Sequence, residues 1–160
     1  MLVERKGDWG VSLKLKNAIV VLGPDVVIGN VHIDAPGEYD VAGVAVRGIP
    51  SEKQTIYVLD VEDMTLCFVP RYPENIGASI SDQIGGVDVA IVPVGKESNA
   101  NDTIALVNAL DSNVVIPVGD GDMEAFAKVS NEATNGHANI KLAKSLIPEE
   151  GRVTYILKTS

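Results

Sequence analysis

The hydrophobic pattern is densest in two short runs, residues 87–95 and 114–118, which contain mostly β-branched and small apolar side chains. Runs of this kind are typical of strands that are covered on both faces. Between them, residues 102–110 carry apolar side chains at helical spacing, and the N-cap expected for this helix is Asn101 or Asp102. A strand, a helix and a strand in this order predict a β-α-β crossover with a parallel strand pair.

The rest of the pattern predicts mostly antiparallel strands. Short segments alternate apolar and polar residues or form compact apolar runs, and turns rich in Gly, Pro, Asn and Asp separate them. Two further short helices are expected at residues 75–84, with Gly85 and Gly86 as the stop, and at residues 122–130. Residues 131–139 indicate a polar loop. The expected strands are residues 11–16, 19–22, 26–28, 31–33, 41–46, 55–61, 64–69 and 153–157.

Composition narrows the function classes. The 160 residues are 46% hydrophobic but only 4% aromatic, so the core is built from aliphatic side chains, in a domain that buries roughly two thirds of its unfolded surface. A net charge of −9 without a basic cluster argues against nucleic-acid binding. No run is long enough to span a membrane, no secretory signal pattern opens the sequence, and Cys67 is the only cysteine, expected to be buried. A cytoplasmic protein is the expectation.

Several local strings carry a family likeness. Residues 14–21, Lys-Leu-Lys-Asn-Ala-Ile-Val-Val, fit an opening hairpin, and residues 35–44, which contain Pro-Gly-Glu-Tyr-Asp, fit a turn and the strand after it. On these strings, and on residues 55–58, 87–95, 114–118 and 147–157, the chain resembles the metallo-β-lactamase-fold hydrolases, within them the ascorbate-lactonase-like branch. The resemblance implies an α/β (α+β) fold: a reduced αββα sandwich of mostly antiparallel sheets with short covering helices, in a single domain over residues 1–160.

The same resemblance implies that the metal ligands are missing. Enzymes of this family hold one or two metal ions with His and Asp side chains and use them to activate a water for hydrolysis. The His-x-His-x-Asp-His loop expected in residues 23–34 is absent. The other ligand positions carry Gly23, Phe68, Arg71 and Gly119, none of which is a zinc ligand. A shortened and degenerate member, without a metal or another cofactor, is therefore expected.

Other polar residues offer weaker candidate sites. Asp120, Asp122 and Glu124 follow a core strand and could contact Ca²⁺ or Mg²⁺, although N-capping of the next helix by Asp120 or Asp122 is the favoured interpretation. His32 alternates with apolar neighbours in a strand, so we expect it on the surface instead of in a metal site. His137 lies in a polar loop and is expected to face solvent.

The cleft in which the enzymes of this family hold their metal ions gives rise to two hypotheses for this chain. Trp9, the only tryptophan, and Phe68 are expected to fill it, because apolar contact replaces the burial of polar groups. Arg71 could pair with an anion there, or form a surface ion pair with Glu74, and the ion pair is the favoured interpretation.

Together these observations predict a non-catalytic, metal-free protein with a binding or self-association role. Loss of the ligand loop is expected to expose strand surface, and a two-fold homodimer would cover it. The alternative is a residual or repurposed metal-dependent hydrolase of lactone, β-lactam or phosphodiester substrates. Such an enzyme would use Asp120, Asp122, Glu124 or His32.

Overall fold

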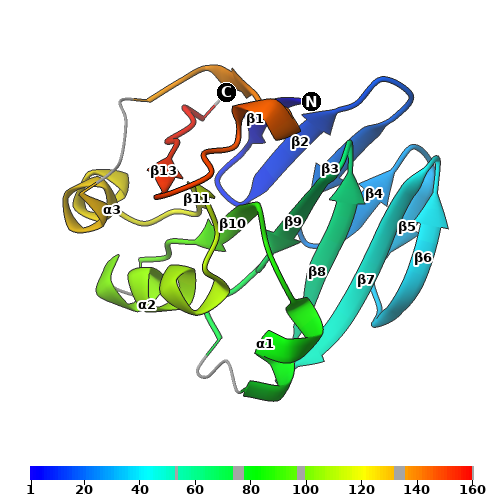
Figure 1. Ribbon diagram of the computed structural model, residues 1–160, viewed down its shortest axis with the longest axis horizontal. Helices are drawn as coiled ribbons and strands as arrows, with labels where there is room; N and C mark the ends of the chain where they lie inside the picture. Colours follow the sequence, from blue (N-terminus) through cyan, green and yellow to red (C-terminus); the bar gives the residue numbers. More distant parts are fainter. Residues whose placement is uncertain (53, 74–77, 97–99, 132–135, 160) are drawn as a thin grey trace.

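The structure is a computed structural model that describes residues 1–52, 54–73, 78–96, 100–131 and 136–159. Two β-sheets lie face to face in it (Figure 1). The first sheet contains β1 (Leu2–Lys6), β2 (Gly10–Lys14), β3 (Ile19–Leu22), β4 (Val26–Ile28), β5 (Val31–Ile33) and β12 (Asn139–Lys141). In space these strands run in the order β12-β1-β2-β3-β4-β5, and neighbouring strands are antiparallel.

The second sheet is mixed. It contains β6 (Gly37–Val41), β7 (Val44–Ser51), β8 (Gln54–Val61), β9 (Met64–Phe68), β10 (Val89–Pro93), β11 (Val114–Val118) and β13 (Val153–Thr154). Its order is β13-β11-β10-β9-β8-β7-β6, antiparallel from β6 to β9 and parallel from β9 to β13. The parallel pair β10 and β11, joined through a helix, confirms the predicted β-α-β crossover.

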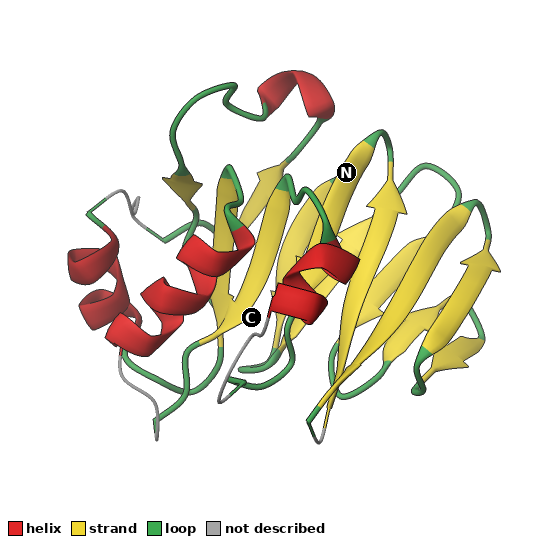
Figure 2. Ribbon diagram, turned by 60° about the horizontal axis from the view of Figure 1, so that its bottom comes forward, coloured by secondary structure: helices red, strands yellow, loops and turns green. Residues whose placement is uncertain are grey.

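The helices lie on the outer face of the second sheet. They are α1 (Ala78–Ile84), α2 (Ala100–Leu110) and α3 (Met123–Ser130), and a short 3₁₀ turn, η1 (Lys144–Leu146), follows later in the chain. Figure 2 shows the three α-helices on one side of the molecule. Their apolar side chains form a core cluster with the outward residues of β8 to β11, separate from the cluster between the sheets. The reduced sandwich is therefore three layers deep in the part of the chain that is described.

The structure corrects several predicted boundaries. The strand β1 was not expected, because Arg5 occupies an inward position and interrupts the apolar alternation; β12 replaces the end of the predicted polar loop. The strand predicted at residues 153–157 pairs only at β13 and at an isolated bridge formed by Leu157. The helix α2 already begins at Ala100, so the N-cap prediction for Asn101 or Asp102 is wrong. Residues 75–77 of one predicted helix lie outside the described residues.

No helix in the described residues combines the length and the hydropathy needed to cross a bilayer.

Candidate functional site

A cavity of about 790 Å³ opens at one end of the sandwich, within the size range of small-molecule sites. Residues that follow β3, β7 and β9 line it, together with the first residues of β8 and the loops before β2 and β6. Gly23, Phe68 and Arg71, three of the positions matched to metal ligands, lie on its wall. Most of the remaining wall is apolar, with Trp9, Pro24, Pro36, Pro50 and Pro70.

The side chains of Trp9 and Phe68 form part of the wall of this cavity and leave its interior open. Phe68 is buried, with 1% of its surface exposed, and forms part of the wall. Trp9 is 39% exposed and lies at the side of the opening. The prediction that these two side chains fill the cleft holds only in part, because Trp9 packs beside Gly119 while the space next to Gly23, Phe68 and Arg71 stays open. The core positions of Phe68 and its neighbours fix the wall, and the space beyond them stays accessible.

The fourth position, Gly119, lies directly after β11 in a backbone conformation that leaves no room for a side chain. Its φ is +132°, and a Cβ atom there would lie 2.2 Å from the Val94 carbonyl oxygen and 3.1 Å from the Trp9 ring. Its N–H donates to the Asp8 carbonyl at 2.6 Å. Glycine at this position is thus a requirement of the local backbone, since other residues rarely adopt this φ and would clash.

A buried arginine stands against this glycine. Arg5 is 5% exposed, and its Nη2 donates to the carbonyl oxygens of Gly119 at 2.7 Å and Asp8 at 2.8 Å, while Nη1 donates to the Leu157 carbonyl at 3.2 Å. Burial lowers the pKa of Arg5, and the nearby Asp8 charge opposes this effect. The guanidinium places a positive charge against the backbone of Gly119, the position matched to the last metal ligand. Sequence reasoning missed this residue, because the strand β1 that carries it was not predicted.

The donors around the cavity do not fit the metal centre of the family. Zinc requires three or four N, O or S donors at about 2.0–2.3 Å. Among the described residues there is no group of three or more His, Cys, Asp and Glu side chains that could hold a metal ion. The carboxylates of Asp34 and Glu52 line the cavity together with the cation of Arg71, and no described histidine or cysteine does so.

The predicted acidic site after β11 is explained by hydrogen bonds to the backbone. Asp122 is the N-cap of α3, and its Oδ1 accepts from the Ala125 N–H at 3.0 Å. Asp120 does not cap the helix, because its Oδ1 accepts from the Lys96 N–H at 3.1 Å. Glu124 is in the first helical turn, where a negative charge is favourable. The capping interpretation is therefore confirmed for Asp122.

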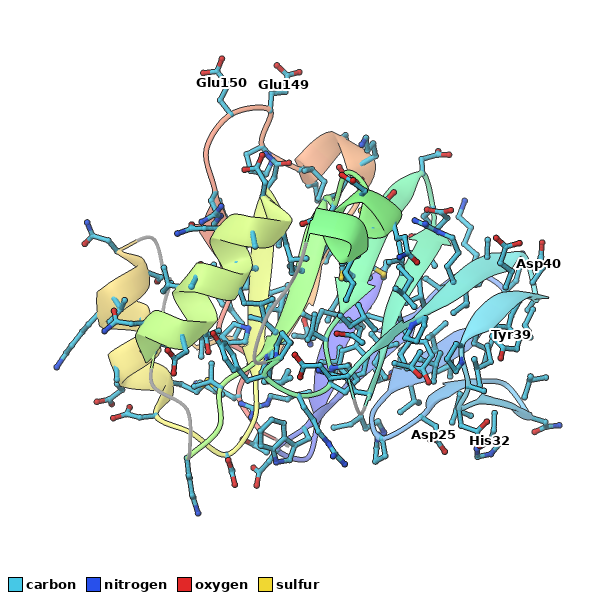
Figure 3. The ribbon with its side chains drawn as sticks, turned by 90° about the horizontal axis from the view of Figure 1, so that it is seen from below. Asp25, His32, Tyr39, Asp40, Glu149 and Glu150 are labelled. Carbon is cyan, nitrogen blue, oxygen red and sulfur yellow. The ribbon has the colours of Figure 1, made fainter. Side chains whose placement is uncertain are left out.

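The two histidines lie in different places. His32 is exposed on the edge strand β5, opposite Val27, at the end of the molecule where Figure 3 also labels Asp25, Tyr39 and Asp40. Its predicted surface position is confirmed. His137 is half-buried, with its ring edge-on to Tyr155 at a centroid distance of 5.9 Å, so the prediction that it faces solvent holds only in part.

Replacing Asp122 by alanine is expected to destabilise the protein by about 1 kcal/mol, because the first turn of α3 loses its cap. Urea unfolding followed by circular dichroism measures the change. Glu124→Gln serves as the matched control, since it removes a charge from the same turn without removing the cap. An equal loss of stability in both variants would contradict the capping interpretation.

Cys67 is fully buried on the helix-covered face, and burial raises its pKa to about 12. We expect no reaction with a thiol reagent at pH 8 until the protein is denatured, because the thiolate is the reactive form. The contribution of this thiol to stability is complete below pH 9 and is lost as the pH rises towards 12, because the unfolded chain releases the proton first. Comparing the pH dependence of unfolding in the wild type and Cys67→Ala isolates the effect.

Comparison with known proteins defines the class. Residues 12–119 match the beta-lactamase superfamily domain, and the chain belongs to this superfamily. A putative zinc-dependent hydrolase of the metallo-β-lactamase superfamily from Thermotoga maritima is similar over 99% of this chain and 100% of its own, at 18% identity and a TM-score of 0.78. This likeness confirms the predicted fold class. A comparison with curated proteins gives no match.

A mutant of the CmlA beta-hydroxylase is similar over 80% of this chain at 11% identity, with a TM-score of 0.52. This chain covers only 32% of that protein. The likeness therefore concerns one domain of a longer enzyme and extends to the fold alone.

Proposed function

We propose that this protein is a metal-free, non-catalytic member of the superfamily that uses the cavity between its sheets to bind a small molecule. The observation that carries this proposal is the geometry at Gly119. A histidine ligand at this position would require a different backbone, because a Cβ atom would lie 2.2 Å from the Val94 carbonyl oxygen. The difference from a metal centre thus extends from the side chain to the main chain.

The charges at the site support the same proposal. The Arg5 guanidinium is held against the Gly119 carbonyl, and Arg71 lies on the cavity wall at the position matched to a bridging aspartate. Arg71 would repel a divalent cation at the cavity wall, and Arg5 would repel one held at Gly119. Phe68 contributes no lone pair. The cavity nevertheless remains open, which favours retention of a binding function.

Metal analysis and activity screening test the proposal together. The protein is purified from cells grown with added zinc, manganese and iron, and its metal content is measured by mass spectrometry. We expect far less than one metal ion per chain, and no hydrolysis of lactone, β-lactam or phosphodiester substrates above buffer. Stoichiometric metal, with activity that a chelator removes, would contradict the proposal. It would favour the alternative of a repurposed hydrolase, in which Asp120, Asp122, Glu124 or His32 holds the metal.

Self-association through the outer face of the first sheet is also part of the proposal. None of the α-helices in the described residues covers this face, and Ile19 is 51% exposed there beside the half-buried pair Val21 and Val27. Pairing through the edge strand β6 is disfavoured, because Glu38 and Asp40 would meet their own copies.

Light scattering over a wide range of concentration tests this dimer. We expect a dimeric mass for the wild type and a monomeric mass for Val27→Lys, with Lys141→Gln as a surface control on the same face. A wild-type monomer at high concentration would contradict self-association. We place the protein in the cytoplasm, which the single buried thiol of Cys67, without a disulfide partner, supports.

A further inference from the structure

Two side chains of opposite charge, Arg71 and Asp34, line the same apolar cavity without pairing with one another. From this arrangement we propose that the cavity binds a small zwitterion whose ammonium and carboxylate groups are separated by an apolar body, as in a short peptide. The inference rests on the proposed binding function and specifies its ligand class. Arg71 receives the carboxylate, Asp34 receives the ammonium group, and the apolar wall packs against the body of the ligand.

The backbone of Arg71 is held in place by a neighbouring side chain. Gln54 Nε2 donates to the Arg71 carbonyl at 2.9 Å, and the Arg71 N–H donates to Gln54 Oε1 at 3.0 Å. This pair of bonds fixes the start of the arginine side chain at the cavity wall. Within the described part of the chain, no carboxylate forms an ion pair with its guanidinium; Glu74, the partner favoured from the sequence, lies outside the described residues. A guanidinium in this position is well suited to a carboxylate, which it can bind through two parallel hydrogen bonds.

Asp34 lies on the side of the cavity formed by Tyr57. The Tyr57 hydroxyl donates to the Ile33 carbonyl at 3.3 Å, next to Asp34 in the chain. Burial chiefly raises the pKa of Tyr57, and the negative charges of Asp25 and Asp34 raise it further. Asp34 is exposed, and no hydrogen bond or ion pair to it is found among the described residues. Its carboxylate is therefore available to a cationic group.

A third charged residue, Glu52, also lines the cavity and has an interaction of its own. The wall thus carries the cation of Arg71 and two carboxylates, of which Asp34 is the one without a partner among the described residues. A ligand with a single charge would pair with only one of Arg71 and Asp34.

The absence of an ion pair between Arg71 and Asp34 sets a lower limit on the separation of the ligand's charges. Arg71 and Asp34 are not within ion-pair distance, so a ligand that reaches both needs separated charges. An extended dipeptide spans about 7 Å, at roughly 3.3–3.6 Å per residue. The cavity of about 790 Å³ has room for such a molecule, and Trp9 and Phe68 provide apolar contacts for its side chains. A single amino acid carries both charges on one carbon atom and is expected to bind more weakly.

Trp9 provides the measurement, because it is the only tryptophan in the chain and lies at the cavity. Its fluorescence is followed while the dipeptide alanyl-leucine is added, and the titration is repeated with the N-acetyl dipeptide, the dipeptide amide and free leucine. We expect saturable binding of the dipeptide. Each loss of a ligand charge should weaken binding by roughly tenfold or more, as for other hydrogen bonds between charged groups.

Variants assign each ligand charge to its partner. Arg71→Gln should weaken binding of the dipeptide and its N-acetyl form, without affecting the amide. Asp34→Asn should weaken binding of the dipeptide and its amide, without affecting the N-acetyl form. Lys141→Gln and Asp40→Asn, which remove exposed charges away from the cavity, should leave all affinities unchanged.

The inference is overturned if Trp9 fluorescence does not respond to the dipeptide, if both capped forms bind as tightly as the free form, or if neither variant changes the affinities. Metal content is measured on the same samples. Absence of both metal and dipeptide binding would overturn this ligand class alone. A bound metal ion needed for activity would overturn the proposed function itself, whatever the peptide titration shows.

Discussion

Gly119→Ala is expected to lower the free energy of unfolding by about 3 kcal/mol or more. This is a large part of the roughly 5–15 kcal/mol by which a folded domain is typically stable against unfolding. Two effects add at this position. The backbone φ of +132° is strained for any residue with a Cβ atom, and that atom would lie 2.2 Å from the Val94 carbonyl oxygen. Since Val94 is packed in the core, the loop that follows β10 would have to shift.

Urea unfolding of Gly119→Ala, Gly86→Ala and Gly7→Ala separates these effects. Gly86 has open space around its Cα and no positive φ, so its substitution should be nearly neutral. Gly7 has a φ of +66° and open space, so its substitution reports strain without a clash. The expected order of stability loss is Gly119, then Gly7, then Gly86. A mild effect of Gly119→Ala would show that the backbone adapts, and would remove the main support for a metal-free site.

Arg5→Met is expected to have the second large effect, a loss of about 3 kcal/mol or more in the free energy of unfolding. The reason is that buried carbonyl groups would lose their hydrogen-bond donors. The guanidinium donates to the carbonyls of Asp8, Gly119 and Leu157, and so joins three segments that are distant in the chain. Arg5→Lys is expected to recover part of this loss, since an ammonium group keeps the charge but cannot reproduce the planar fork of donors.

Lys6→Met is the matched control for Arg5→Met, because Lys6 is the exposed neighbour on the same strand. The midpoint of urea unfolding and the rate of proteolysis near the chain end are the two measurements. We expect Arg5→Met to lower the midpoint and to expose residues around Leu157 to protease, while Lys6→Met changes neither. Equal behaviour of the two variants would show that the buried hydrogen bonds of Arg5 contribute little.

The sequence predicted the elements whose side chains follow a simple period. The aliphatic runs around β10 and β11 and the helical spacing between them were sufficient for the crossover, because both strands are buried on both faces. The strand β1 was missed since the buried side chain at Arg5 is charged, and β12 since it is three residues long with one buried side chain, Ile140. Local pattern carries little information about such strands.

The sequence shows which residues stand at the ligand positions of the site, but it does not show the size of the cavity around them. The absence of ligands at Gly23, Phe68, Arg71 and Gly119 can be read directly from the residues. That Phe68 and Trp9 would leave about 790 Å³ open depends on how the two sheets pack, which the residue pattern does not determine. The contact between Gly119 and Val94 likewise arises from two loops that meet only in the folded chain.

The pairing of β1 with β12 has a consequence for the order of folding. These strands lie far apart in the sequence, at Leu2–Lys6 and Asn139–Lys141, yet they are neighbours in one sheet. Contacts of such large sequence separation require closure of a long loop and form slowly. During synthesis, the edge of the first sheet at β1 therefore stays unpaired until residues 139–141 have left the ribosome.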